Sequence, residues 1–267
     1  MTATTDAAVT AAGSLGTAEL GDLARLVADV CGVPAGPTSP FAAPLLLFAR
    51  LDDARRRALF APRPGRVLVQ EQLAIEASGR LAADKVVSVR FRFGEPANEI
   101  AAFRIEADLV GPDEAPLAAI HTSIRPVEAA SLAAAIGLPF PPAADSPGRS
   151  TRPLDAEIVG RWLRLVGDEN PIHTDAGHAA SLGLAGPVVP GALLAAAAED
   201  LAGAPGMRLR RLNMRFMAPI PLGATVTTRT REKPDASAAG RRDLRLFFLC
   251  GDRAAAVADL GFTVAAD

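Results

Sequence analysis

The chain has 267 residues, 49% of them hydrophobic, and a formal net charge of −2. This balance is typical of a globular protein of one or two domains, and it excludes disorder and a basic surface for nucleic acid. With only two cysteines, a disulfide framework is excluded and a reducing, cytoplasmic setting is expected. The first 16 residues lack the features of a signal peptide, and no long uncharged apolar run predicts a membrane helix.

The first half of the chain begins with helical patterns and continues with strand patterns. Residues 1–16 are small and polar, and they are predicted to be a flexible N-terminus. Apolar side chains recur at helical spacing over residues 17–32, and a second helix is expected from about Pro44 into the fifties. Four strands are predicted after it, at residues 67–76, 85–93, 99–110 and 115–127.

The second half repeats the first in outline, at an offset of about 140 residues. Five prolines lie between residues 139 and 153, so residues 138–153 are predicted to be a stiff linker. We therefore expect the α+β class, with two copies of one unit in which an antiparallel sheet packs around a helix. The predicted domains are residues 17–137 and residues 154–267.

Reactive side-chain types are concentrated at residues 167–173, Gly-Asp-Glu-Asn-Pro-Ile-His. Pro171 favours an extended conformation for Asn170, so the polar side chains of this stretch are expected on a loop. A carboxylate and an imidazole that flank one water molecule, Asp168 and His173, would form an acid–base pair near neutral pH. The alternative is a loop in which Asp and Asn hydrogen-bond their own backbone, as these residue types often do.

Further along, Pro190 and Gly191 precede an alanine-rich apolar stretch and are expected to begin a helix. Because Gly191 has no Cβ, a ligand could approach its backbone closely. The bare N–H groups of a helix N-terminus suit a carbonyl oxygen that gains negative charge during a reaction. A plain N-cap glycine is the other interpretation of this position.

These two stretches resemble the MaoC-like (R)-specific enoyl-CoA hydratases, the hydratase-2 family. The Gly-Asp-x-Asn-Pro-x-His signature of that family is present unchanged at residues 167–173, and a looser likeness extends over residues 212–223. The sequence departs from the family pattern around the oxyanion glycine. Pro190 and Ala192 stand where the family usually has His and Met.

The resemblance implies a double hotdog fold, in which two antiparallel sheets each wrap a central helix and join edge to edge. It also implies reversible hydration of a trans-2-enoyl thioester of CoA or acyl carrier protein to the (R)-3-hydroxyacyl thioester, a reaction of fatty acid metabolism. No metal and no cofactor are required. The implied roles are activation of water by Asp168 and His173, orientation of the loop or the water by Asn170, an oxyanion donor at Gly191, and substrate binding by Val189, Pro190 and Arg215.

The N-terminal half lacks the signature, and residues 41–45 stand in the place of residues 188–192. A degenerate half that binds the acyl chain beside an active half is the consistent interpretation. Two alternatives stay open: a hotdog thioesterase, and a non-catalytic subunit that binds acyl thioesters, which the loss of the family's His at Pro190 supports. The oligomeric state also stays open, with a homodimer as one option.

The remaining candidates have plainer interpretations. Arg161 and Arg164, like Arg215, could meet the phosphates of a pantetheine-bearing ligand, but such residues are more often surface charges. His178 is expected to be a solvated helix residue and His121 a structural one. No second His or Cys lies at ligand spacing, so no metal site is predicted.

Overall fold

The computed structural model describes residues 9–35, 41–50, 65–85, 87–94, 101–140, 146–204, 206–233 and 240–264. The strands are β1 (Val9–Gly13), β2 (Arg66–Ala77), β3 (Val87–Gly94), β4 (Phe103–Val110), β5 (Pro116–Glu128), β6 (Leu138–Pro139), β7 (Ser146–Ser150), β8 (Met207–Phe216), β9 (Thr227–Glu232), β10 (Arg241–Cys250) and β11 (Arg253–Val264). The helices are α1 (Thr17–Cys31), α3 (Ala129–Ala133), α4 (Ala156–Val166), α5 (Ala176–Ser181) and α6 (Gly191–Ala202), with 3₁₀ segments η1 (Ala43–Arg50) and η2 (Pro171–His173).

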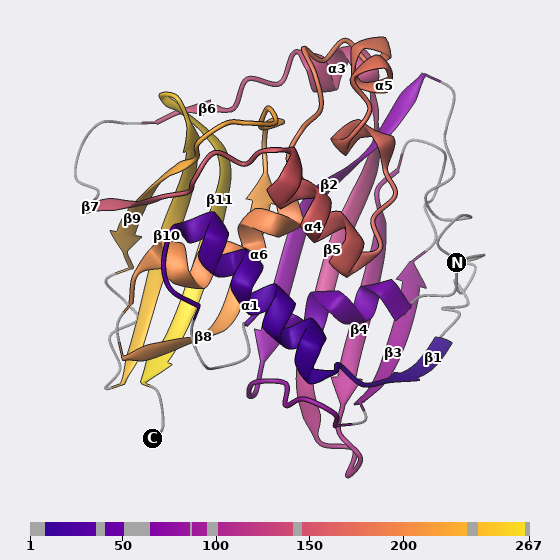
Figure 1. Cartoon of the computed structure of the whole chain (residues 1–267), viewed down its shortest axis with the longest axis vertical. Coiled ribbons are helices and arrows are strands. Elements are labelled where there is room, and N and C mark those ends of the chain that lie inside the picture. The colour runs from indigo at the N-terminus through magenta and orange to yellow at the C-terminus, as the bar shows by residue number, and fades with distance from the viewer. Residues whose placement is uncertain are drawn as a thin grey trace, which may run out of the picture.

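All the strands belong to one antiparallel sheet in which the two halves of the chain follow the same plan. The order is β1-β3-β4-β5-β2 for the first half and β8-β11-β10-β9-β7 for the second, with β6 paired to β11. The halves join where β2 runs beside β8, and Ile75 faces Leu212 across this seam (Figure 1). Because each half runs outward from the seam in corresponding strand order, the sheet contains an internal repeat.

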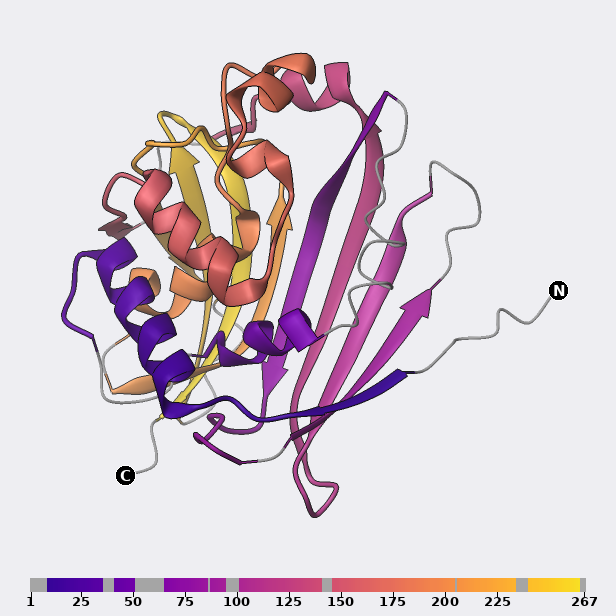
Figure 2. The same ribbon diagram turned by 45° about the vertical axis from the view of Figure 1, so that its right-hand side comes forward.

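Helices α1, α4 and α6 lie on one face of the sheet, which curves around them (Figures 1 and 2). Alternation along the strands supplies the apolar inner face, as in β3, where Val89 and Phe91 are buried and Arg90 is exposed. Helix α6 can lie close to the sheet because residues 195–198 are all alanine and at most 3% exposed. This arrangement confirms the predicted α+β double hotdog fold.

Three segments differ from the sequence prediction. Residues 9–13 fall in the segment predicted to be flexible, yet they pair with β3 at the edge of the sheet. The predicted linker also enters the sheet, since β6 pairs with β11 and β7 pairs with β9. Its prolines are compatible with this because an end strand pairs on one side only. The helix expected from Pro44 is the 3₁₀ segment η1, and its expected continuation lies outside the described residues.

Candidate active site

The signature loop, residues 167–173, begins where α4 ends. Asp155 caps the start of this helix, and its carboxylate accepts a hydrogen bond from the Ile158 N–H at 3.0 Å. Gly167 ends the helix in the left-handed conformation, with φ of 63°, which glycine adopts without the steric cost of a Cβ. The Asp168 N–H then donates to the Leu163 carbonyl at 3.0 Å. These contacts fix the point at which Asp168 leaves the helix.

Two side chains of the loop hold its own backbone. Asp168 Oδ1 accepts from the Asn170 N–H at 3.0 Å, and Asn170 Oδ1 accepts from the Ile172 N–H at 3.2 Å. Asn170 is thereby the N-cap of η2, and Pro171 follows it in the first position of the turn. The self-bonded loop expected as an alternative is therefore present, but it occupies only one oxygen of Asp168.

The other oxygen of Asp168 faces His173. His173 Nδ1 lies 2.7 Å from the carbonyl oxygen of Val188, and because a carbonyl only accepts, we assign the proton to Nδ1. In the neutral ring Nε2 then carries the lone pair, and it lies 3.7 Å from Asp168 Oδ2. That distance exceeds a hydrogen bond. Two acceptors thus face each other, on side chains that are 12% and 33% exposed, an arrangement suited to a small molecule with two donor hydrogens.

Val188 is the residue that sequence reasoning missed at this site. Its N–H donates to the Ile172 carbonyl at 3.1 Å, and it forms a β-bridge with Pro221. The next residue, Val189, donates to the Ile220 carbonyl at 2.8 Å. This strand-like segment holds the carbonyl that orients His173. No side-chain pattern could have marked it, because the contact is made by the backbone.

Helix α6 begins at Gly191, with Pro190 as its N-cap, as the sequence predicts. A Cβ on Gly191 would lie 2.6 Å from Cε1 of Phe216. Real Cβ atoms do not approach other atoms so closely, so any side chain at this position would require the Phe216 ring to shift. The first N–H groups of a helix have no partner within it, and this end of α6 is therefore suited both to packing on Phe216 and to binding an oxygen.

The other predicted binding residues lie in different environments. Val189 is 7% exposed, with its side chain in the main apolar core, and Pro190 is also buried. Arg215 is exposed on β8 between the inward-facing Met214 and Phe216. Because side chains alternate along a strand, Arg215 lies on the outer face of the sheet, opposite α6. The structure does not bring it to the signature loop.

Three further residues considered in the sequence also belong to the surface or to packing between helices. Arg161 Nη1 lies 2.5 Å from Asp29 Oδ2, so this side chain ties α4 to α1. Arg164 is exposed in the last turn of α4. His121 lies on the outer face, with Nδ1 3.6 Å from Glu106 Oε1.

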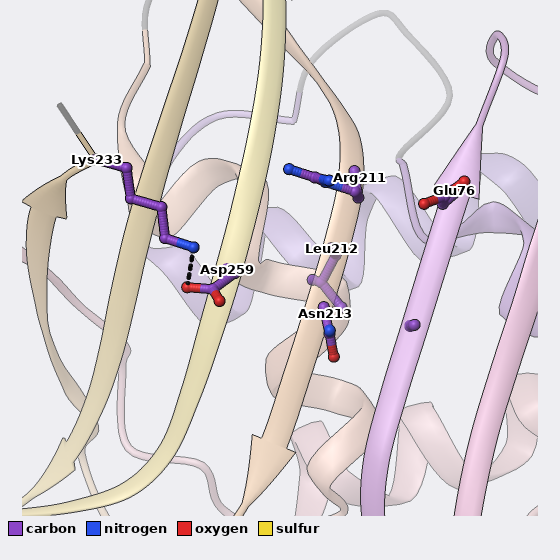
Figure 3. A pocket seen from close by; sticks show the side chains of 7 residues that line it. Glu76, Arg211, Leu212, Asn213, Lys233 and Asp259 are labelled. Carbon is purple, nitrogen blue, oxygen red and sulfur yellow. Dashed lines mark ion pairs between the residues drawn. The ribbon is translucent and has the colours of Figure 1, made fainter. Parts of the chain in front are cut away.

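A hollow of about 230 Å³ lies on the outer face of the sheet, away from the loop (Figure 3). Its cations come from Arg211 and Lys233, and each is paired. Lys233 Nζ lies 2.9 Å from Asp259 Oδ1, and Arg211 Nη2 lies 3.4 Å from Asp243 Oδ2. Because these carboxylates neutralise the cations within the sheet, the hollow is a weak candidate for binding an anionic ligand.

Two further kinds of group bear on the chemistry of the described residues: cysteines and possible metal ligands. Burial raises the pKa of the Cys31 thiol to about 12, so this cysteine is protonated and a poor nucleophile. Within the described residues, no three His, Cys, Asp or Glu side chains gather as a metal site would require. No helix in the described part of the chain is long and apolar enough to cross a membrane.

The signature loop and helix α6 lie in a part of the sequence that matches a known family model. Residues 144–242 match the model described as the MaoC like domain. This part of the C-terminal half is therefore similar in sequence to MaoC-like domains. HtdX of Mycobacterium tuberculosis matches with a TM-score of 0.66 and 19% identity, over 95% of this chain and 99% of that one. A structure named as a MaoC-like dehydratase matches with a TM-score of 0.73 and 15% identity, over 97% and 98% of the two chains.

Thioesterases share this fold as well. An acyl-ACP thioesterase from Bacteroides thetaiotaomicron matches with a TM-score of 0.58 and 11% identity, over 96% of this chain and 97% of that one. No curated protein sequence matches the chain at a significant level. At these identities the similar structures support the double hotdog fold alone. Evidence about the reaction comes from the family match at residues 144–242 and from the side chains of the loop.

Proposed function

We propose that this protein catalyses the reversible hydration of a trans-2-enoyl thioester, carried on CoA or acyl carrier protein, to the (R)-3-hydroxyacyl thioester. The observation that carries the proposal is the pair of acceptors in the MaoC-like domain. His173 Nε2 and Asp168 Oδ2 lie 3.7 Å apart, and the Val188 carbonyl holds the other ring nitrogen at 2.7 Å. Addition of water to a conjugated double bond needs a base for the water and an acid for the α-carbon, and one such pair can supply both.

The reaction follows from the geometry of the pair. A water molecule that donates one hydrogen to Asp168 Oδ2 and the other to His173 Nε2 keeps a lone pair for the β-carbon. As the new C–O bond forms, the pair takes one water proton and the double-bond electrons move toward the carbonyl oxygen as an enolate. A proton from the pair then adds to the α-carbon, which restores the starting state. Acid–base catalysis of this kind contributes roughly 10²–10⁴-fold.

The enolate oxygen needs a donor of its own, and we assign this role to the N-terminus of α6. Gly191 follows Val188 by three residues, so one segment carries both the carbonyl that orients His173 and the helix end. A preorganised N–H donor at such a position is worth roughly 10²–10³-fold in rate. Dehydration of the 3-hydroxyacyl thioester follows the same steps in reverse.

One experiment separates hydration from its alternatives. The protein is incubated with crotonyl-CoA while the absorbance of the conjugated enoyl thioester and the release of free thiol are followed together. Loss of the enoyl band without thiol release is expected. Thiol release would instead indicate a thioesterase, and binding with neither change would indicate a non-catalytic subunit. Chiral analysis of the product tests the (R) configuration, and Asp168→Asn serves as the control for catalysis at this site.

A further inference from the structure

The end of the signature loop and the segment that follows it, residues 172–188, pack on the N-terminal half. They do so through a small apolar core that is separate from the main one. The buried members of this small core are at most 9% exposed: Val67, Ile172, Ala179, Leu184 and Val188. Val67 comes from β2, and the other four come from residues 172–188. From the N-terminal half, Val69, Val127 and residues of α3 also pack against it. The N-terminal half thus supplies an apolar surface, here called the wall, against which the loop segment of the C-terminal half packs.

The position of this wall is determined by strand pairing in the sheet and does not depend on the loop. Val67 and Val127 are register partners on β2 and β5, so their backbone positions are fixed by strand pairing. Helix α3 lies beside α5 in both ribbon views (Figures 1 and 2). A Cβ on Gly183, just after α5, would lie 3.3 Å from the Cβ of Ala133 in α3. The segment that follows the loop therefore packs closely against α3 of the N-terminal half.

Two residues of the small core also take part in the hydrogen bonds around the His173 imidazole. The Val188 N–H donates to the Ile172 carbonyl at 3.1 Å, and the Val188 carbonyl accepts from His173 Nδ1 at 2.7 Å. The side chains of Ile172 and Val188 both lie in the small core. We therefore expect a change in packing there to shift the Ile172 backbone, which precedes His173, and the Val188 carbonyl that selects the tautomer.

We propose that Val67 is a positioning residue for His173. Its side chain, which belongs to the half without the signature, keeps the Val188 carbonyl where it holds Nδ1–H. If that carbonyl moves, the proton can transfer to Nε2, which then donates directly to Asp168 and no longer accepts from water. The catalytic consequence rests on the proposed function, whereas the tautomer itself depends on no reaction.

The tautomer can be read by NMR on protein labelled with ¹⁵N-histidine, recorded without substrate. The chain has only three histidines, and the His173 signals are identified by their loss in His173→Gln. In the unmodified protein we expect a neutral ring with the proton on Nδ1. In Val67→Ala we expect a mixture of the two tautomers, together with a fall in kcat of about tenfold and little change in KM.

A matched control makes the same truncation elsewhere in the N-terminal half. Val87 is 4% exposed on β3 and lies in the main core, so Val87→Ala removes the same atoms from a buried position remote from the loop. Its His173 signals should be those of the unmodified protein. If Val67→Ala does not fold, Val127→Ala removes the register partner of Val67 and takes its place in the comparison.

The two hypotheses fail in different ways. Retention of a single Nδ1–H tautomer in Val67→Ala, or in Val127→Ala where that variant is needed, would show that Val67 only stabilises the fold. An equal tautomer change in Val87→Ala would show a general response to lost packing and would also overturn the inference. A tautomer change specific to Val67 in a protein that does not hydrate enoyl thioesters would support the positioning role and refute the proposed function.

Discussion

The two halves of the sheet follow one plan but place different groups at corresponding points. In the second half, α6 begins at Gly191 after a loop that carries Asp168 and His173. In the first half, η1 lies between α1 and β2, as α6 lies between α4 and β8. The alignment of the halves inferred from the sequence sets Pro44 against Gly191. Proline has no N–H, so this position of the first half has no backbone hydrogen to donate to an oxyanion.

The first half instead supports the second by packing. The Cys31 thiol of α1 donates to the Ala197 carbonyl of α6 at 3.9 Å, and Arg80 pairs with Glu199, two residues further along that helix. Val67 provides the wall for the loop. A double hotdog can therefore assign its chemistry to one half and the positioning of that chemistry to the other.

Removal of the acid–base pair should have the largest effect. Asp168→Asn and His173→Ala are each expected to lower kcat by at least about 100-fold, with the fold retained by circular dichroism. The double variant should be little worse than either single one, because the two side chains act as a unit. His121→Ala is the control, since this histidine lies in the other half with its side chain 49% exposed. Near-normal turnover in either variant of the pair would end the proposed mechanism.

Substitution of Gly191 should affect both activity and stability. A helix N-terminus tolerates most side chains at modest cost, so the sequence predicts a small change in Tm. The structure favours a larger effect, because a Cβ would lie 2.6 Å from Cε1 of Phe216 and this ring would have to shift. Gly191→Ala is therefore expected to lower Tm, and to lower kcat/KM by about tenfold or more if the thioester also passes here.

A second change separates these two roles of Gly191. Phe216→Leu makes room for the new methyl group, so Gly191→Ala/Phe216→Leu should recover thermal stability relative to Gly191→Ala, with Phe216→Leu alone as the control. If activity stays low while Tm recovers, the glycine serves the substrate. If both recover together, the glycine serves packing alone, and the oxyanion must be bound elsewhere.

The contact between Arg80 and Glu199 tests how firmly the first half holds α6. The side chains are 16% and 21% exposed, and Glu199 Oε1 also accepts from the Leu209 N–H at 2.8 Å. Arg80→Ala would leave this carboxylate without its cation and should cost about 2–3 kcal/mol in urea unfolding, somewhat less than for a fully buried pair.

The surface pair of Arg90 and Glu114 provides the control for Arg80. These side chains are 44% and 67% exposed, so Arg90→Ala should cost less than about 1 kcal/mol. Equal losses in Arg80→Ala and Arg90→Ala would mean that the contact across the halves adds no more than a surface ion pair does.

Local patterns predicted much of this molecule. Alternation gave the strands, Pro171 gave the loop, and Pro190 with Gly191 gave the start of α6. Contacts between distant segments were not predictable, as for the Val188 carbonyl. The prolines of residues 138–153 indicate stiffness but do not reveal that β6 and β7 pair with other strands.

Arg215 and Val67 both show that the sequence does not reveal contacts between distant segments. Arg215 was expected at the site and lies elsewhere, whereas Val67 was not expected there and packs against the loop segment. Arg215 was a reasonable binding candidate because the sequence does not tell which face of β8 turns toward α6. The structure places it on the outer face, between Met214 and Phe216, which point inward. Val67 reads as an ordinary strand residue, and its contact with the loop depends on how the two halves join.

The smallest expected effect lies at the C-terminal end of α6. Burial and the neighbouring charge of Glu199 raise the pKa of Asp200 above 3.8, and Arg149 and Arg80 only partly offset this. A carboxyl whose pKa is higher in the folded state contributes its stability below the unfolded pKa and loses it as the pH rises through the folded value. Ionised Asp200 therefore destabilises the protein at neutral pH. Asp200→Asn should raise the free energy of unfolding at about pH 7 by less than about 1 kcal/mol, since solvent screens the partly exposed group.

This gain should shrink as the pH falls and disappear below the ordinary pKa of 3.8, where both states are protonated. Asp22→Asn is the control on α1 of the other half, because the Asp22 side chain is 54% exposed beside Arg25, and it should give no gain at neutral pH. Urea unfolding of both variants at several pH values measures the difference. If Asp200→Asn and the unmodified protein had the same free energy of unfolding at every pH, Asp200 at the end of α6 would be as well hydrated as Asp22 on α1. The helices of the two halves would then not differ in the burial of this charge.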